Sequence, residues 1–406
     1  MVIRLALLFL IPVPEPSSDA NWYLKRAITL AEQDTYSDGG ILTAYWPVGY
    51  PAFLALLFKA TGPSLLAARL ANLVLAAASF WLLYAVARRF LQDELTARGA
   101  ILLMTIYPNN AAYVPLLLTE TLYTFLLLGG SLLLLLRQNW INTMAVGGVF
   151  GLATLVKTQT ILLIPLLAFL AFLGEWSIKN ALRAAIRAGV VLCMALVVVA
   201  PWTLRNYSIF GTFVLVSTNG GIALLAGNNP SAVGDYRTDY SDKDPLFARA
   251  QYSVEDQIRA ERRARSLAYD WIKHNPGQFL GLIPKKVFRL WAPDGEAEWS
   301  YTGSPFYRDH SRWFRFARVA NQAFYVLMLF VFLMALWKLL KIRPTPIAFF
   351  GIGVVLVLTL ISVIFSGQSR YHFPAMPFIL AYAAWVLLGP GGHRRDPQHD
   401  IATGCA

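Results

Sequence analysis

The chain has 406 residues, of which 57% are hydrophobic and only 14% are charged. Soluble domains contain about 25% charged residues, so the composition excludes an ordinary soluble enzyme and predicts an all-α polytopic membrane protein. The net charge of +12 does not indicate nucleic acid, because the cations border apolar segments, where anionic membrane lipids are the expected partners.

Ten apolar segments are candidate membrane spans, since a helix of about 20 apolar residues crosses a bilayer. The first begins with Arg4 and resembles a short signal sequence, and we interpret it as a short or truncated span. The candidates are 2–14, 64–87, 99–113, 116–136, 141–157, 159–173, 186–204, 316–337, 345–365 and 373–389.

These segments divide the chain into an N-terminal membrane module (1–204), a long outer region (205–315), C-terminal membrane helices (316–390) and a polar cytoplasmic tail (391–406). Orientation follows from the short loops, because Lys and Arg accumulate on the inner side. With the N-terminus inside, the inner connections contain most of the short-loop cations: Arg88, Arg89, Arg98, Arg137, Lys179, Arg183, Arg187, Lys338, Lys341 and Arg343, and the tail adds Arg394 and Arg395.

The first outer loop, 15–63, is expected to contain a helix at about 20–33 and a glycine-rich turn after Asp38. An apolar stretch follows from Trp46 to Phe58. Because it is only about 13 residues long and contains prolines, we place it along the membrane interface rather than across the bilayer.

The second outer region, 205–315, is expected to have mixed structure with a helix at 254–274. Ser253 and Asp256 supply an approximate capping box at its start, and Asn275-Pro-Gly ends it. The amphipathic segment 279–291 mixes aromatic and cationic residues, including Lys285 and Lys286, as expected of a helix at the level of the lipid headgroups.

Five ionisable residues lie in or beside apolar segments and are predicted to share the outer face. They are Asp19, Glu120, Lys157, Arg205 and Arg370. A charge at the bilayer centre costs about 3 kcal/mol or more, so such residues are candidates for a functional site. Their common side predicts one polar site that faces away from the cytosol.

Each of these residues also has a structural interpretation. Asp19 follows Ser-Ser after prolines and has the position of a helix cap or first-turn acid, with Tyr23 one turn later. Glu120 either acts in the site or pairs with Lys157 or Arg370 to fix helix packing. Lys157 and Arg205 stand at span exits, where cationic side chains commonly extend to the interface.

Arg370 lies between two spans, with Tyr371 and His372 after it. Small residues precede it and prolines follow, which indicates a shaped loop rather than a simple exit. Arginine also suits bidentate binding of phosphate. We therefore interpret Arg370 as a functional residue.

Other motifs give little support to other chemistry. Asp242-Lys-Asp244 has the DxD form of metal-dependent sugar transferases, but we interpret it as a solvated turn. We therefore expect no cofactor, and the use of a divalent metal stays open. Cys193 and Cys405 form neither a disulfide framework nor a metal-type spacing. Nucleotide-loop, zinc-protease and hydrolase signatures are absent from the sequence.

Taken together, these residues resemble the GT-C superfamily of glycosyltransferases, of the kind that includes protein O-mannosyltransferases (glycosyltransferase family 39) and bacterial aminoarabinose transferases. The resemblance covers nearly the whole chain. Each motif is loose, but their order and shared side make the set specific. The motifs are Asp19 with Tyr23, Trp46-Pro-Val-Gly-Tyr-Pro, Thr119-Glu120, Ala200-Pro-Trp-Thr-Leu-Arg-Asn, Gly227-Asn-Asn-Pro and Arg370-Tyr-His-Phe-Pro. Two departures are the short first span and Tyr45-Trp46, where some relatives have lysine.

The resemblance implies transfer of a sugar from a polyprenyl-phosphate donor to a lipid, glycan or protein acceptor, with inversion. It implies multi-pass insertion in the cell inner (plasma) membrane with the site facing the periplasm or exterior. Asp19 corresponds to the catalytic base and Glu120 to a second acid. We expect donor or phosphate binding by Tyr23, Lys157, Arg205, Lys285, Lys286, Arg370, Tyr371 and His372.

The competing interpretation is a transporter or flippase for a lipid-linked or small anionic substrate. Such a protein would use the same buried charges. Transporters commonly contain internal repeats and broken helices near the membrane midplane, and the sequence shows neither.

Overall fold

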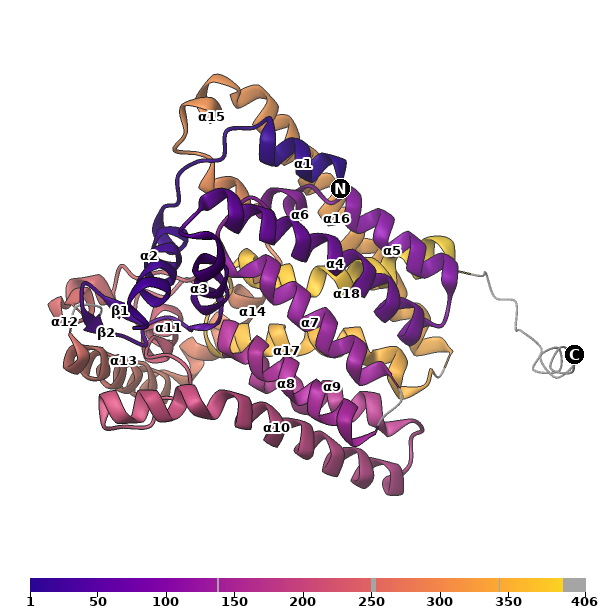
Figure 1. The fold of residues 1–406 in the computed structure, drawn as a ribbon. Helices are drawn as coiled ribbons and strands as arrows, with labels where there is room; N and C mark the ends of the chain where they lie inside the picture. Colours follow the sequence, from indigo (N-terminus) through magenta and orange to yellow (C-terminus); the bar gives the residue numbers. More distant parts are fainter. Residues whose placement is uncertain (137–138, 250–252, 343, 390–406) are drawn as a thin grey trace, which may run out of the picture.

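The structure, a computed structural model, describes residues 1–136, 139–249, 253–342 and 344–389. Helices make up most of it, which confirms the all-α prediction (Figure 1). Within the described residues, the only sheet is the antiparallel pair β1 (Ser37–Asp38) and β2 (Ile41–Leu42). The predicted tail 391–406, Arg137 and Arg343 lie outside the described residues.

Five segments are long and apolar enough to cross a membrane: α4 (Leu65–Leu91), α10 (Ile178–Phe210), α16 (Ser311–Lys341), η3 with α17 (Pro346–Ile364), and η4 with α18 (Ser369–Leu388). Shorter apolar helices coincide with three more of the expected spans. These are α7 (Thr119–Leu135), α8 (Trp140–Val156) and α9 (Thr160–Leu173). Polytopic membrane insertion therefore agrees with the helix pattern.

Two expected spans differ from a simple helix. The segment 99–113 is broken into α5 (Glu94–Ile106) and α6 (Pro108–Tyr113), because Pro108 cannot continue the hydrogen bonding of α5. The segment 2–14 contains only α1 (Val2–Phe9), eight residues long. Arg4 on α1 is fully buried and donates to the carbonyls of Met104 and Thr105 and to Asn110 Oδ1. These bonds satisfy a charge that the sequence left unexplained.

Small residues allow close packing between the apolar helices. On α8, Gly147 and Gly151 lie against α10, where an added Cβ would stand 2.3 Å from Met194 Cβ and 2.6 Å from Val198 Cβ. Close backbone approach of this kind is the main source of attraction between helices in lipid. The interface between α8 and α10 therefore depends on glycine at both positions.

One end of the helical bundle carries the elements of both predicted outer regions, and we call it the site end (Figure 1). It contains α2 (Ser18–Gln33), the β1–β2 hairpin, α3 (Gly49–Thr61), α11 (Gly220–Gly227), η1 (Ser241–Lys243), α12 (Pro245–Arg249), α13 (Val254–His274), α14 (Pro276–Leu290), η2 (Glu296–Ser300) and α15 (Pro305–Asp309).

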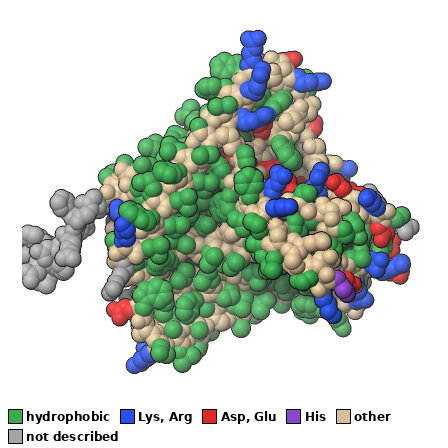
Figure 2. Space-filling model, turned by 180° about the vertical axis from the view of Figure 1, so that it is seen from behind, with side chains coloured by type: hydrophobic (Ala, Val, Ile, Leu, Met, Phe, Trp, Pro, Cys, Tyr) green, Lys and Arg blue, Asp and Glu red, His purple; other side chains and the backbone are tan. Residues whose placement is uncertain are grey.

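The local predictions for the site end are largely confirmed. Ser253 Oγ accepts from the backbone N–H of Asp256 at the start of α13, and Asn275 follows its last residue. The glycine-rich turn joins the two strands through Gly39 and Gly40, both with positive φ. Figure 2 shows a broad apolar surface over the bundle, with charged side chains gathered at the site end.

Candidate active site

Asp19 and Arg370 meet at the site end. Arg370 Nη1 donates to Asp19 Oδ2 at 2.8 Å, and both side chains are half-buried. Asp19 lies in the first turn of α2, whose N-cap is Ser17. Its carboxylate therefore contacts a residue from the far end of the chain, in addition to its favourable place at a helix N-terminus.

Glu120 binds the same guanidinium from the other side. Arg370 Nε donates to Glu120 Oε1 at 2.6 Å and Nη2 donates to Oε2 at 3.2 Å, a bidentate pair. Lys157 Nζ donates to Glu120 Oε1 at 3.2 Å. The Glu120 side chain is fully buried, whereas 14% of the Lys157 side chain and 19% of the Arg370 side chain are exposed. Glu120 is thus enclosed by two cations.

Helix ends position three of these four charges. Glu120 lies in the first turn of α7, where the helix dipole favours an anion, and Lys157 is the C-cap residue of α8, where it favours a cation. Arg370 comes from the 3₁₀ segment η4 (Ser369–Ala375), which follows α17 after a short turn. The turn before η4 packs tightly on α14, since an added Cβ at Gly367 would stand 1.9 Å from the Lys286 carbonyl oxygen.

The charge cluster borders a cavity of about 1140 Å³. Asp19, Lys157 and Arg370 line it together with Tyr23 and Tyr371, two further predicted site residues. Apolar residues of α9 and α17, including Leu162, Leu358 and Ile361, form part of its wall. A cavity of this size holds a sugar-sized polar group beside an apolar chain.

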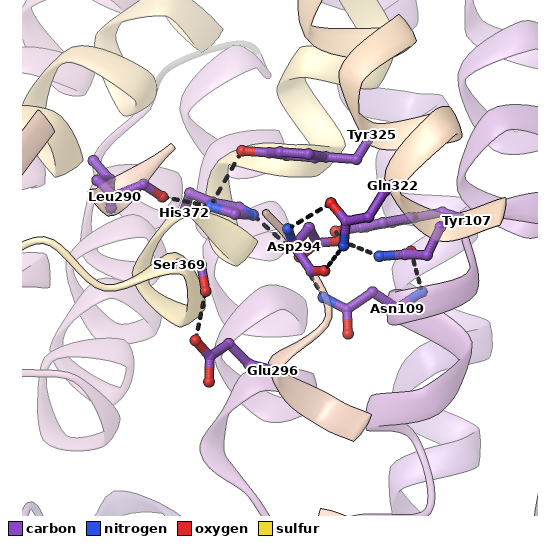
Figure 3. A network of polar contacts seen from close by, with 10 residues as sticks. Tyr107, Asn109, Leu290, Asp294, Glu296, Gln322, Tyr325, Ser369 and His372 are labelled. Carbon is purple, nitrogen blue, oxygen red and sulfur yellow. Dashed lines mark hydrogen bonds and ion pairs between the residues drawn. The ribbon is translucent and has the colours of Figure 1, made fainter. Parts of the chain in front are cut away.

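His372 follows the cluster but is not among the residues that line the cavity. It is fully buried, with Nδ1 2.7 Å from the Leu290 carbonyl oxygen and Nε2 3.2 Å from Asp294 Oδ1 (Figure 3). Its ring stacks between Trp291 and Tyr325, with centroids at 5.6 and 4.9 Å. The ring thus anchors the segment that carries Arg370 and does not reach a ligand in the cavity.

Asp294 is the centre of this network (Figure 3). Its carboxylate accepts from Tyr107 Oη at 2.7 Å, from Asn109 Nδ2 at 2.5 Å and from Asn321 Nδ2 at 3.1 Å, in addition to its pair with His372. Burial raises the pKa of Asp294. The charge of His372 and the hydrogen bonds from His372, Tyr107 and Asn321 outweigh burial and lower the pKa overall. Three elements, α6 with its N-cap Tyr107, α16 and η4, are thus joined at one carboxylate.

The remaining predicted cations lie apart from the charge cluster. Arg205 donates to the carbonyls of Thr43 and Tyr36 and so fixes the β1–β2 hairpin against α10. Lys285 is exposed on α14, and Lys286 is fully buried. None of these three lines the cavity. The structure therefore does not place these three residues beside the cavity where we expect the donor phosphate.

Lys286 instead joins one of the predicted motifs to the end of α17. Its Nζ donates to Asn228 Oδ1 at 2.7 Å, within the Gly227-Asn-Asn-Pro motif, and to the Val363 carbonyl oxygen at 3.1 Å. Gly227 allows the two segments to meet, because an added Cβ would stand 1.8 Å from the Phe365 carbonyl oxygen. The motif thus supports the α17–η4 turn rather than the cavity.

The DxD residues make local turn contacts. Asp242 Oδ2 accepts from Thr238 Oγ1, and Asp244 Oδ1 accepts from the backbone N–H of Leu246. This agrees with their interpretation as a turn. Within the described residues, no group of three or more His, Cys, Asp or Glu side chains has the arrangement of a metal site.

Several residues of this site were missed by the sequence analysis. Asp294 and Glu296 stand in a Pro-Asp-Gly-Glu turn pattern, which resembles a solvated loop, and Tyr107 and Tyr113 look like ordinary apolar residues beside a span. The carboxylates flanking Gly295, inside an outer region otherwise rich in arginine, were the one available signal.

Comparison with known proteins supports the predicted resemblance. Residues 46–204 match the model of the family described as dolichyl-phosphate-mannose-protein mannosyltransferase. No curated protein matches the chain in sequence.

Among solved structures, the oligosaccharyltransferase of Archaeoglobus fulgidus in complex with Zn and sulfate has a TM-score of 0.56 at 14% identity, covering 95% of this chain and 48% of that one. AglB from the same organism, in complex with an inhibitory peptide and a dolichol-phosphate, also has 0.56 at 14%, covering 95% and 49%. ArnT from Cupriavidus metallidurans, bound to undecaprenyl phosphate, has 0.45 at 14%, covering 96% and 76%.

The chain therefore spans about half the length of the oligosaccharyltransferases that it matches and shares their fold. The fold of these oligosaccharyltransferases and the mannosyltransferase family match over 46–204 both agree with the resemblance predicted from the sequence.

Proposed function

We propose that this chain is a membrane glycosyltransferase that moves a sugar from a polyprenyl-phosphate donor to an acceptor on the extracytoplasmic side of the cell inner membrane. The observation that carries the proposal is the convergence of Asp19, Glu120, Lys157 and Arg370 at one cavity. The family model and the dolichol-phosphate bound by AglB support the choice of donor.

The donor phosphate is placed against Lys157 and Arg370, with its apolar tail along α9 and α17. Both cations stand beside the cavity and keep their charge close to the leaving group. As the bond to the sugar breaks, negative charge grows on the phosphate, and preorganised cations stabilise that charge more than they stabilise the bound donor. Glu120 holds the two cations in place, since it contacts both.

Asp19 acts as the general base and takes the proton of the acceptor nucleophile. Attack from the face opposite the departing phosphate gives inversion at the anomeric carbon. A positioned general base contributes roughly 10²–10⁴-fold to the rate. Because Arg370 contacts both Asp19 and Glu120, one side chain links the base to the phosphate site.

The test uses the purified full chain in lipid nanodiscs with a panel of labelled polyprenyl-phosphate sugars. We expect donor turnover that Asp19→Asn lowers at least about 100-fold, the lower limit for loss of a general base. Asp34→Asn is the matched control, because Asp34 also lies at an end of α2 but is exposed and pairs with Lys59. Unchanged turnover in Asp19→Asn would remove the base role, and transport of intact donor would identify a transporter.

A further inference from the structure

The cavity has two sides with different side chains. One side, next to α9 and α13, carries the cations Lys157, Arg262 and Arg265, together with Glu261, which pairs with Arg265. The other side is formed by α6, η2 and the start of α4, and we call it the acid side. It is lined by Glu15, Arg69, Tyr113, Glu296 and Trp299. Asp19 and Arg370 contribute to the same cavity. The basic side suits a phosphate, so the acid side is left for the second substrate.

Contacts within the described residues join neighbouring parts of the acid side. Arg69 Nη2 lies 3.4 Å from the Pro14 carbonyl oxygen, beside Glu15. Tyr301, next to the η2 helix, donates to the Ala112 carbonyl oxygen beside Tyr113 at 3.2 Å. Figure 2 shows the surface hollowed between the α15 segment and the α13 end, with acidic side chains inside the hollow.

Glu296 is held in place by a hydrogen bond to η4, the segment that carries Arg370. Ser369 Oγ donates to Glu296 Oε1, and His372, three residues after Ser369, pairs with Asp294, two residues before Glu296 (Figure 3). These contacts lock the Glu296 segment beside the Arg370 segment. Glu296 therefore reaches the cavity from a rigid support, as a group that positions a substrate requires.

The Glu296 carboxyl group keeps capacity for a ligand. Ser369 is its only hydrogen-bond partner among the described residues, and it bonds one of the two oxygens. Burial raises the pKa of Glu296, although the Ser369 hydrogen bond and the charge of Arg370 oppose this. A carboxylate can accept from two hydroxyls at once, and a carboxylic acid can also donate.

Tyr113 supplies a second polar group without a protein partner. Its side chain is 1% exposed and lines the cavity, and no described residue forms a hydrogen bond with its hydroxyl. A buried hydroxyl without a hydrogen-bond partner destabilises the folded protein. A ligand hydroxyl in the cavity would recover that cost.

Trp299 adds an apolar face. It lines the cavity, yet 69% of it is exposed. An exposed indole at the edge of a polar cavity suits a ligand with one apolar face and one polar face. A sugar ring has this form, with C–H bonds on its faces and hydroxyls around its rim.

We propose that the acid side binds a hydroxyl-rich, uncharged carbohydrate as the acceptor, so that the enzyme extends a glycan. This rests on the proposed function. Glu296 and Tyr113 hold the ring hydroxyls, Arg69 donates to them, and Trp299 stacks on the ring. The acceptor oxygen bonds to the anomeric carbon of the donor sugar as the bond from that carbon to the phosphate oxygen breaks. The hydroxyl proton goes to Asp19 and the electron pair to the phosphate.

The test measures binding of methyl glycosides of glucose, mannose and galactose to the full chain in nanodiscs by saturation-transfer NMR. We expect at least one glycoside to bind, with about tenfold weaker affinity in Glu296→Gln and in Tyr113→Phe, the loss for one hydrogen bond. Glu298→Gln is the matched control, because Glu298 lies on the same η2 helix but pairs with Arg318 and Tyr307 and does not line the cavity.

Thermal stabilisation by undecaprenyl phosphate separates this inference from the proposed function. We expect stabilisation in wild type, Glu296→Gln and Tyr113→Phe, and its loss in Arg370→Ala. Stabilisation without any glycoside binding would overturn the acceptor inference alone. Binding of a Ser/Thr peptide that depends on Glu296 would overturn it in favour of a protein acceptor. Glycoside binding without stabilisation would keep the carbohydrate site and overturn the donor.

Tyr113→Phe also gives a readout in which stability and binding move in opposite directions. Removing a hydroxyl without a protein partner should leave the melting temperature unchanged or raise it, while glycoside affinity falls. Tyr382→Phe is the control, because the Tyr382 hydroxyl is bonded to the Ala348 carbonyl oxygen at 2.7 Å and should lose stability without any change in affinity. A lower melting temperature in Tyr113→Phe with unchanged affinity would assign that hydroxyl to packing.

Discussion

Arg370 donates to Asp19 at 2.8 Å although the two residues are 351 positions apart in the chain. The same guanidinium forms a bidentate pair with Glu120. The first outer loop, the start of α7 and the segment after α17 are therefore held by one side chain. A change at Arg370 affects the geometry of both acids at once.

Arg370→Lys should lower turnover of a polyprenyl-phosphate sugar by about 100-fold or more. A lysine keeps the charge but cannot form the fork that contacts two carboxylates and, in the proposed mechanism, the donor phosphate. The measurement is kcat with saturating donor. Arg318→Lys is the control, because Arg318 makes a comparable pair with Glu298 away from the cavity. Equal activity of Arg370→Lys and wild type would show that charge alone suffices.

Glu120→Ala should destabilise the protein more than Lys157→Ala. Loss of Glu120 leaves two largely buried cations without their shared partner, and breaking a buried pair in this way costs about 3–5 kcal/mol. Loss of Lys157 leaves Glu120 paired with Arg370, so the penalty is smaller. Thermal unfolding in the same detergent gives the comparison. The reverse order would mean that Lys157, rather than Arg370, neutralises Glu120.

The sequence predicted the charge cluster because buried ionisable residues are expensive in a membrane. Asp19, Glu120, Lys157 and Arg370 were identified from apolar context alone, and all four meet. The same rule failed for Arg205, since a cation near a span exit can be satisfied by backbone carbonyls, here those of Thr43 and Tyr36. Local sequence cannot distinguish these partners, because both lie more than 160 positions away.

Helix positions were predictable from apolar runs, whereas their breaks were less so. The cap of α13 was correct because Ser253 and Asp256 are neighbours in sequence. The Asp294 network was not predicted, because its partners come from distant parts of the chain, namely α6 with its N-cap, α16 and η4. His372 was assigned to the cavity from its place beside Arg370, yet in a 3₁₀ segment residues two apart point in different directions.

Asp294→Ala should lower both stability and donor turnover. The change leaves buried donors from Tyr107, Asn109 and Asn321 without an acceptor, each costing about 1–3 kcal/mol. It also releases His372, so the segment that carries Arg370 loses its anchor. Thermal unfolding and kcat measure the two effects. Loss of stability with unchanged kcat would show that the network does not position Arg370.

The stability contribution of Lys286 should depend on pH in the alkaline range. The side chain is fully buried among Asn228 and backbone carbonyls, and none of its hydrogen-bond partners among the described residues is an acid. Burial lowers its pKa to about 8, whereas an exposed lysine titrates near pH 10.4. Between these values the unfolded chain binds more protons than the folded chain, so stability rises with pH.

Lys286→Met removes this titration, so it serves as the comparison. The difference in melting temperature between wild type and Lys286→Met should shift in favour of wild type as the pH rises from 7 to 9.5. Below about pH 8 the buried lysine is charged in both states and its desolvation cost is fully present. Lys285→Met is the matched control, because Lys285 is the exposed neighbour on α14. A difference that stays constant with pH would mean that the hydrogen bonds from Lys286 to Asn228 and the carbonyls keep it protonated throughout.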